Sequence, residues 1–382
     1  MCIRDSYYTG VGRNADTCIL MAQPHFHSIS RDNNLNAIRY YLAVSILVGH
    51  FAVLSGLPIV TLPRIFGNAG SFFAISGFLM FHSYEKSSSN RQYFLRRARR
   101  ILPPYILVVL LAAIGLSVVS TLPIAEYFTT SGFWKYLGAN LIFLNFLHTD
   151  LPGVFDSSHN IVNSVNGSLW TMKCEVTFYL LIPLIYKWIK NSRFSAATIL
   201  WICLIFSTAI FWGLKCIEIA KGEDFEVFLK LVRSLSIFLA GGLANIYITL
   251  LLKFRWWIII LSLALYAADV FDFLTGWMPI ALITHIYVYP IFAGIMALAA
   301  GLTGSWGKAL SRHDTFSYDI YLFHYPIIQL LLFYGCAESL GAYRCLTLAI
   351  VITVVAAFLS WKFIGSRFLK PATQRLAVPL ES

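Results

Sequence analysis

The stretch LPPYILVVLLAAIGLSVVS, residues 102–120, carries no charged side chain and is long enough to cross a bilayer as a helix. At 1.5 Å per residue such a helix covers about 28 Å, close to the thickness of the hydrocarbon core. The sequence before it, FLRRARRI over residues 94–101, is basic, which is typical of the cytoplasmic end of a membrane span. Together the two stretches predict a transmembrane helix.

The composition extends this prediction to the whole chain. Its 382 residues are 58% hydrophobic and only 12% charged, whereas a soluble domain carries about 25% charged residues. The apolar residues fall in long runs and do not alternate, which argues against a soluble enzyme. The net charge of +11 comes from lysines and arginines that cluster in short loops between these runs. This is a pattern of membrane topology and not of nucleic-acid binding.

Several apolar runs have the length of a membrane span, when their amphipathic ends and a helix tilt are included. They cover residues 37–56, 67–84, 102–120, 168–187, 196–214, 230–250, 256–271, 279–301, 316–335 and 345–364. We therefore expect an all-α membrane protein, a bundle of about ten transmembrane helices.

One further apolar run, residues 133–147, is shorter and needs a different interpretation. Basic clusters at residues 86–100 and 187–193 both belong on the cytoplasmic side, so an even number of crossings must separate them. The runs at residues 102–120 and 168–187 already supply two crossings. Residues 133–147 are therefore expected to form a short interfacial or re-entrant helix, and both termini are expected in the cytoplasm.

The chain divides into three parts. Residues 1–30 are expected to be a disordered or non-native leader, because they are polar, lack the apolar core of a signal peptide and begin with MCIRDS. The native start is then expected at Met21. Residues 31–370 are expected to form one membrane domain, and residues 371–382 a cytoplasmic tail.

The seven cysteines form no CxxC pair and no cluster with histidines at metal-ligand spacing. No metal site is therefore expected. Cys336 and Cys345 flank one predicted outer loop, where they either pair or act as small residues that tolerate an apolar environment.

Arg39 and His50 are polar residues inside the first predicted span, where a charge costs about 2.5–3.5 kcal/mol on insertion scales and often carries function. They are eleven residues apart, close to three helical turns, so both side chains share one face. Arg39 lies at the cytoplasmic end and His50 toward the outer third. An imidazole at this depth is either a general base or a hydrogen-bond partner of a neighbouring helix.

Glu175 is the carboxylate of the run at residues 168–187. It lies about 10 Å below the outer surface, because that span is entered from outside. His50 reaches a similar depth, and a carboxylate level with an imidazole is what a base and its orienting partner require. The alternative is an ion pair with Lys173 or with a remote arginine.

Arg97 and Arg100 belong to a basic loop that precedes the third span. The loop is a topology signal. It is also suited to holding phosphates, because arginine makes bidentate contacts to them.

A polar stripe in the run at residues 316–335 repeats at helical spacing and consists of Ser317, Tyr321 and His324. Pro326 follows and frees a backbone carbonyl one turn earlier, which can be tolerated inside a bundle. Such a stripe serves either chemistry or contacts between helices.

Five motifs in these segments carry a resemblance to a known family. They are the stretch from Leu35 to His50 with its Arg-x10-His pattern, FFAISGFL at residues 72–79, Arg97-x-x-Arg100-Ile101-x-Pro103-x-Tyr105, Ser168-Leu169-Trp170 followed by Glu175, Phe178-Tyr179 and Pro183, and Ser317-Tyr318 followed by Tyr321-Leu322-x-His324-x-Pro326. Over about residues 33–370 the chain resembles acyltransferase family 3, the bacterial membrane O-acyltransferases that decorate surface polysaccharides and other acceptors.

The resemblance implies an O-acyltransferase of the bacterial inner membrane that moves an acyl group, usually acetyl, from acyl-CoA to a hydroxyl of a cell-surface or lipid-linked glycan. No cofactor is expected to stay bound, since acyl-CoA is a co-substrate. His50 is implied as the catalytic base, with Glu175 orienting it. The implied donor-binding residues are Arg39, Arg97 and Arg100, and the implied contacts to substrate or transition state are Ser76, Trp170, Tyr179, Ser317, Tyr321 and His324.

The chain departs from the family pattern at one motif. Many members have two adjacent glutamates there, whereas Val176 follows Glu175 in this chain, so Glu175 is the only carboxylate of that motif. The alternative function is a secondary transporter of sugars or organic anions, which would also use intramembrane Arg, His and Glu. The paired half-chain repeats expected of such a transporter are not found in the sequence.

Overall fold

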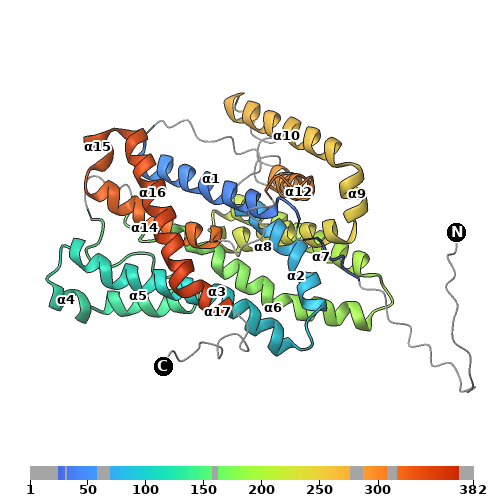
Figure 1. The fold of residues 1–382 in the computed structure, drawn as a ribbon, viewed down its shortest axis with the longest axis horizontal. Coiled ribbons are helices and arrows are strands. Elements are labelled where there is room, and N and C mark those ends of the chain that lie inside the picture. The colour runs from blue at the N-terminus through green and yellow to red at the C-terminus, as the bar shows by residue number, and fades with distance from the viewer. Residues whose placement is uncertain are drawn as a thin grey trace, which may run out of the picture.

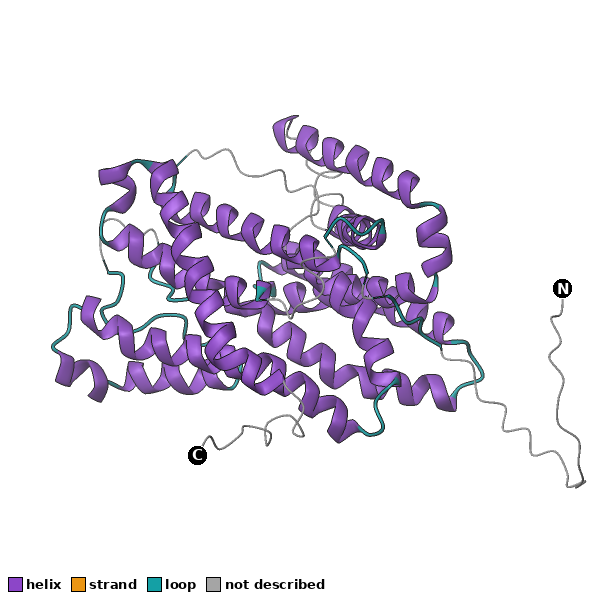
Figure 2. Cartoon of the chain, in the orientation of Figure 1, coloured by secondary structure: helices purple, strands orange, loops and turns teal. Residues whose placement is uncertain are grey.

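The structure is a computed structural model, and it describes residues 25–30, 32–57, 69–156, 162–275, 287–307 and 316–369. Within these ranges every regular element is a helix, as Figure 2 shows. This confirms the predicted all-α fold class. The predicted tail at residues 371–382 and most of the predicted leader lie outside the described residues.

The main helices, which are labelled in Figure 1, overlap the apolar runs of the sequence. They are α1 (Leu35–Ser55), α2 (Ala69–Glu85), α3 (Asn90–Gly115), α6 (Trp170–Asn191), α7 (Ala196–Lys221), α8 (Glu226–Ile246), α10 (Arg255–Thr275), α12 (Tyr289–Leu302), α14 (Ser317–Phe333) and α16 (Ala342–Ser360). The short elements are η2 (Leu116–Val119), α4 (Ile124–Thr129), α5 (Ser131–Leu141), η3 (Gly167–Leu169), α9 (Ile248–Lys253), α15 (Cys336–Leu340), η5 (Trp361–Gly365) and α17 (Ser366–Leu369).

Six helical segments of the described chain are long and apolar enough to cross a membrane, so the chain is a multi-pass membrane protein. They are Leu35–Ser55, Asn90–Val119, Gly167–Asn191, Ala196–Lys221, Glu226–Ile246 and Ala342–Phe368. The other main helices are shorter or less continuously apolar, and α2 and α14 have 17 residues each. The predicted count of about ten crossings is therefore not confirmed.

The short apolar run at residues 133–147 forms α5, which ends at Leu141. A helix of 11 residues is about 16 Å long, too short to cross the hydrocarbon core. It ends early because the chain turns at Phe143, whose φ is 64°. The run therefore contributes no full crossing, while its predicted interfacial or re-entrant position stays a prediction.

A small cluster of buried aromatic residues joins α4 and α5 to the end of α3. The Tyr105 hydroxyl of α3 donates to the carbonyl oxygen of Asn140 at 2.6 Å, and the Tyr127 hydroxyl of α4 donates to that of Ala113 at 2.7 Å. Burial raises the pKa of Tyr127 to about 12, so this hydroxyl stays protonated and keeps its bond. Helices α4 and α5 are thus tied to α3 by buried hydrogen bonds.

Helix α2 lies at the centre of the bundle and crosses α8 at very short range. A Cβ atom at Gly77 of α2 would overlap the carbonyl oxygen of Phe238, and one at Gly241 of α8 would overlap that of Ala74. Only glycine allows the two backbones to approach this closely, as in other membrane helix pairs. The glycine of the FFAISGFL stretch is therefore a packing residue.

The segment just before α1 packs against the bundle. The backbone nitrogens of His25 and Phe26 donate to the two carboxylate oxygens of Glu85 at 2.9 and 3.1 Å, and the Phe26 ring is fully buried against Phe81. The amide of Asn245 binds both the N–H and the carbonyl of His27. Residues 25–27, which belong to the stretch predicted as a disordered or non-native leader, are thus attached to the bundle by a buried aromatic ring and paired backbone groups.

The α2–α8 crossing yields a first prediction. Replacing Gly77 by alanine inserts a methyl group where backbone already lies, and overpacking of this kind costs about 1–3 kcal/mol. The thermal midpoint of the purified protein in detergent should therefore fall. Gly213→Ala on α7 is the matched control, because no atom beyond the adjoining backbone of its own helix lies within 4 Å of the added methyl group. Equal midpoints for the two variants would contradict the crossing.

Candidate active site

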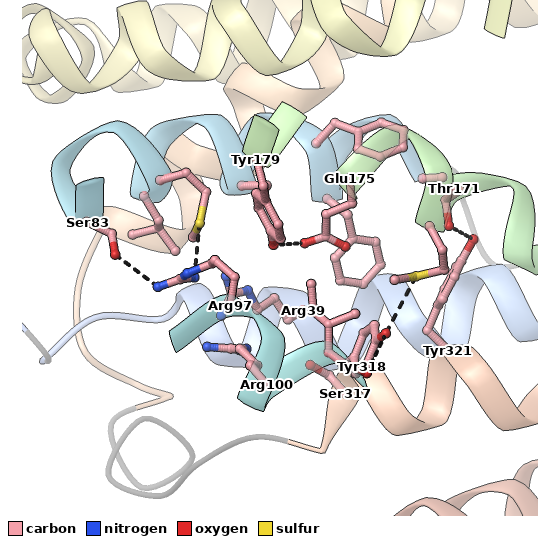
Figure 3. Close-up of a pocket in the computed structure, with 18 residues that line it drawn as sticks. Arg39, Ser83, Arg97, Arg100, Thr171, Glu175, Tyr179, Ser317, Tyr318 and Tyr321 are labelled. Carbon is pink, nitrogen blue, oxygen red and sulfur yellow. Dashed lines mark hydrogen bonds between the residues drawn. The ribbon is translucent and has the colours of Figure 1, made fainter. Parts of the chain in front are cut away.

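A cavity of about 300 Å³ lies inside the bundle, between α1, α2, α3, α6 and α14 (Figure 3). Its wall is partly apolar, with Phe72, Phe73 and Met80 among the lining residues. The polar lining residues are Arg39, Ser76, Ser83, Arg97, Arg100, Thr171, Glu175, Tyr179, Ser317, Tyr318 and Tyr321. Eight of the site residues predicted from the sequence are therefore in one cavity.

Three arginines reach this cavity from two helices. Arg97 and Arg100 come from successive turns of α3, and Arg39 comes from α1. Arg97 donates to Ser83 Oγ at 2.9 Å and to Met80 Sδ at 3.0 Å, whereas its buried Nε has no hydrogen-bond partner among the described residues. An unpaired buried donor is costly unless a ligand completes it. Arg97 is thus held in place, while its Nε–H has no partner among the described residues.

The basic segment is not the loop expected from the sequence, since residues 90–101 form the first turns of α3. Ser89 caps the helix by accepting from the Gln92 backbone N–H at 3.2 Å, and arginine is a good helix former. The helix then continues through Pro103 and Pro104. A rigid helix, and not a flexible loop, therefore fixes the direction of Arg97 and Arg100.

Glu175 faces the same cavity from α6. It accepts a very short hydrogen bond from the hydroxyl of Tyr179, one helical turn further on. No salt bridge joins it to a described arginine, and the ion pairs that are seen, such as Lys215–Glu218, lie elsewhere. Three guanidinium groups and one carboxylate give the cavity a net positive charge, so it is suited to an anionic ligand.

Ser76 and Tyr321 supply hydroxyl groups to the wall. The Ser76 hydroxyl is buried without a partner among the described residues. Tyr321 donates its hydrogen to the Ser168 carbonyl oxygen at 2.9 Å, and its oxygen lies 2.9 Å from Thr171 Oγ1. The Tyr321 hydrogen is therefore engaged by the protein, whereas that of Ser76 is available for a ligand.

His50 does not line the cavity and lies beside His324. His50 Nδ1 is 2.7 Å from His324 Nε2, and the edge of the Tyr325 ring packs against the His50 ring. His324 is fully buried and does not reach the cavity as a substrate contact. Tyr321 belongs to both regions, because its hydroxyl faces the cavity while its carbonyl oxygen lies 2.7 Å from His324 Nδ1.

The predicted pairing of His50 with Glu175 is not what the structure describes. Each residue has a different hydrogen-bond partner, His324 for His50 and Tyr179 for Glu175. Trp170 likewise lies outside the cavity wall, between the Phe73 ring and the ammonium group of Lys230. The sequence did not reveal on which side of its helix each of these side chains lies.

Pro326 leaves a carbonyl of α14 without its helical donor, as the sequence suggested. That carbonyl, of Leu322, accepts from the Asn166 side-chain amide at 2.9 Å. The other end of the same amide accepts from the Ser168 hydroxyl at 2.7 Å. Asn166 therefore ties the start of α6 to the proline position of α14, and so aligns two walls of the cavity.

Three residues that line the cavity were not among the site residues predicted from the sequence: Ser83, Thr171 and Tyr318. Ser83 follows Ser76 by seven residues and Thr171 precedes Glu175 by four, so both pairs share a helix face. Helical spacing from the chosen residues would have found both. Tyr318, whose hydroxyl donates to the carbonyl oxygen of Ile101 at 3.4 Å, belongs to the Ser317-Tyr318 motif but was given no role.

No group of three or more His, Cys, Asp or Glu residues suited to a metal ion occurs in the part of the chain that the structure describes. Cys336 and Cys345 are free thiols buried in one cluster next to α1.

Residues 32–362 match the sequence profile of the acyltransferase domain family. The chain belongs to this family. Nodulation protein 10 of Rhizobium leguminosarum bv. viciae is 26% identical to this acyltransferase over 387 positions, which cover 94% of the chain and 98% of the relative. The O-acetyl transferase of Shigella phage Sf6 is 25% identical over 370 positions, covering 91% of the chain and 99% of that relative. No solved structure matches the chain.

Residues 32–362, which match the family, include every residue that lines the cavity. Each of the five motifs quoted from the sequence contributes at least one lining residue. They are, in motif order, Arg39, Ser76, Arg97 with Arg100, Glu175 with Tyr179, and Ser317 with Tyr321. The five motifs, which are separate in the sequence, therefore meet around one cavity.

Asn166 gives a prediction for the site. Asn166→Ala leaves the buried Leu322 carbonyl without a donor, which costs about 1–3 kcal/mol of unfolding free energy. The thermal midpoint should fall accordingly. Asn163→Ala serves as the control, because Asn163 is exposed and such changes stay within about 0.5 kcal/mol. A fall of the same size in the control would refute the link between α6 and α14.

Proposed function

We propose that this acyltransferase moves an acetyl group from acetyl-CoA to a hydroxyl of a cell-surface or lipid-linked glycan. Family membership supports acyl transfer, and the name of the phage relative, an O-acetyl transferase, supports acetyl as the group. The observation that carries the proposal is a cationic cavity linked through Tyr321 to the hydrogen-bonded pair of His50 and His324.

The cavity is the proposed donor site. Coenzyme A carries several phosphates, and arginine binds phosphate through charge-assisted, often bidentate hydrogen bonds. Arg100 is exposed at the cavity wall, while Arg39 and Arg97 are half-buried. About 300 Å³ is at the lower end for a ligand pocket, which suits the thioester arm with the phosphates outside. The donor would enter from the cytoplasm, with both termini on that side of the inner membrane.

The transfer itself requires a base. In our proposal the His50 imidazole takes the proton of the acceptor hydroxyl while its oxygen attacks the thioester carbonyl carbon. The carbon–sulfur bond then breaks, and the sulfur leaves as thiolate and takes up the proton. The products are an acetyl ester and coenzyme A. The unpaired hydroxyl of Ser76 can donate to the carbonyl oxygen as negative charge develops there.

Glu175 has a donor-side role in this scheme. Its carboxylate faces the cavity and is held by Tyr179. There it can accept from N–H or O–H groups of the donor and partly balance the arginines. Ser317 contributes a further hydroxyl to the same wall.

Removal of the base is the direct test. His50→Gln should lower kcat by at least about 10²-fold, the usual contribution of general base catalysis. Incorporation of radiolabelled acetyl groups from acetyl-CoA into membrane glycans of the host measures this. His148→Gln changes a histidine that follows α5 and does not line the cavity, so this variant should keep the wild-type rate. Wild-type transfer by His50→Gln would show that His50 is not the base.

The donor site makes a separate prediction. Arg100→Gln should raise the KM for acetyl-CoA by about tenfold or more, because a hydrogen bond between charged groups contributes about 1.5–3 kcal/mol. Arg99→Gln removes the same charge from the preceding residue, which is exposed and does not line the cavity. This variant should change the KM for acetyl-CoA little. With acetyl-pantetheine, which lacks the nucleotide phosphates, Arg100→Gln and wild type should behave alike. An equal KM increase in both arginine variants would contradict a specific phosphate contact.

A further inference from the structure

His50 and His324 form a hydrogen-bonded pair between α1 and α14. Their rings are nearly parallel, with 6° between the ring planes, and His50 Nδ1 lies 2.7 Å from His324 Nε2. The other ring nitrogen of His324, Nδ1, lies 2.7 Å from the carbonyl oxygen of Tyr321. The two imidazoles thus form a chain that ends on a backbone carbonyl.

The direction of each hydrogen bond in this chain follows from its last member. A carbonyl oxygen can only accept, so Nδ1 of His324 carries a hydrogen. His324 is fully buried, and a charged imidazolium there would lose its hydration with only backbone carbonyls and a second imidazole as partners. A neutral imidazole has one donor and one acceptor nitrogen. Nε2 of His324 therefore accepts, and Nδ1 of His50 donates.

This assignment decides where the lone pair of His50 lies. With its hydrogen on Nδ1, the neutral His50 ring carries its lone pair on Nε2. In water a neutral histidine side chain favours the tautomer with its hydrogen on Nε2. The protein therefore has to impose the tautomer with the hydrogen on Nδ1. The hydrogen bond at one ring nitrogen selects the state of the other, as is common for functional histidines.

Packing also fixes the orientation of both rings. The Tyr325 ring meets the His50 ring at 73°, with centroids 5.3 Å apart, and meets the His324 ring at 73°, with centroids 6.3 Å apart. The ring of His324 is held further by Tyr321, which lies one helical turn earlier. Contacts with the Tyr321 and Tyr325 rings therefore hold the two imidazoles in defined orientations.

We infer that His324 is a positioning residue, which fixes the tautomer and ring plane of His50 so that Nε2 of His50 takes the proton of the acceptor hydroxyl. The inference rests on the proposed function of His50 as base. His324 then has the orienting role that the family resemblance implied for Glu175.

His324 does not itself gain or lose a proton in this scheme. When Nε2 of His50 takes up the hydroxyl proton, His50 becomes an imidazolium and its Nδ1–H bond to His324 becomes charge-assisted, hence stronger. The bond from His324 to the Tyr321 carbonyl holds the His324 acceptor nitrogen in place during this change. The pair stabilises the imidazolium without placing a carboxylate beside it.

Nitrogen NMR of the full-length protein in lipid bilayers tests the tautomer directly. The protein is labelled with ¹⁵N-histidine, and the His50 signals are assigned by their loss in His50→Gln. We expect a protonated Nδ1 and an unprotonated Nε2 at His50 in the wild type. In His324→Phe the proton should move toward Nε2. An unprotonated Nδ1 of His50 in the wild type would overturn the inference.

Kinetics test the consequence. His324→Phe keeps a ring in place but removes the acceptor nitrogen, so kcat should fall about 10²–10³-fold while the KM for acetyl-CoA changes by less than about threefold. His324→Gln keeps an acceptor oxygen and should recover at least about a tenth of the wild-type kcat. A wild-type kcat in folded His324→Phe would refute the positioning role. If the Phe variant does not fold, the Gln variant and the wild-type spectrum decide.

The failure of this inference differs from the failure of the proposed function. Full activity of His50→Gln would show that His50 is not the base, whatever the NMR spectrum shows. Loss of activity in His50→Gln together with full activity and an unchanged tautomer in His324→Phe would overturn the positioning role alone.

Discussion

A charged side chain is costly in the hydrocarbon of a membrane, and this cost organises the molecule. Arg39 and Arg97 lie among apolar helices, so the bundle has to enclose them in a polar space away from lipid. Five helices converge to do this, and the same enclosure collects Glu175 and several hydroxyl groups. The cavity is therefore both the solution to a solvation problem and the place where an anionic ligand can bind.

Helix α2 shows how closely packing and chemistry are combined. Gly77 allows its backbone to touch that of α8, and the neighbouring Ser76 turns its hydroxyl into the cavity. Adjacent residues of a helix point about 100° apart, so one short motif can serve a packing face and a ligand face. Crossing geometry and the position of the Ser76 hydroxyl thus depend on each other.

The site has two parts that meet at Tyr321. Its hydroxyl belongs to the cavity wall, and its backbone carbonyl accepts from His324, the partner of His50. In the proposed function the first part holds the donor and the second holds the base. Such a division suits an enzyme whose two substrates arrive from opposite sides of a membrane, because each part can face its own substrate.

The sequence alone predicts the all-α fold class, the family and eight of the residues that line the cavity. Long apolar runs dictate helices in lipid, and polar residues such as Arg39 and Glu175 inside them have to face the interior. Tertiary structure alone decided that His50 pairs with His324 and Glu175 with Tyr179. Counting residues along a span gives the depth of a side chain, whereas its partner depends on which helices are neighbours and how each is rotated about its axis.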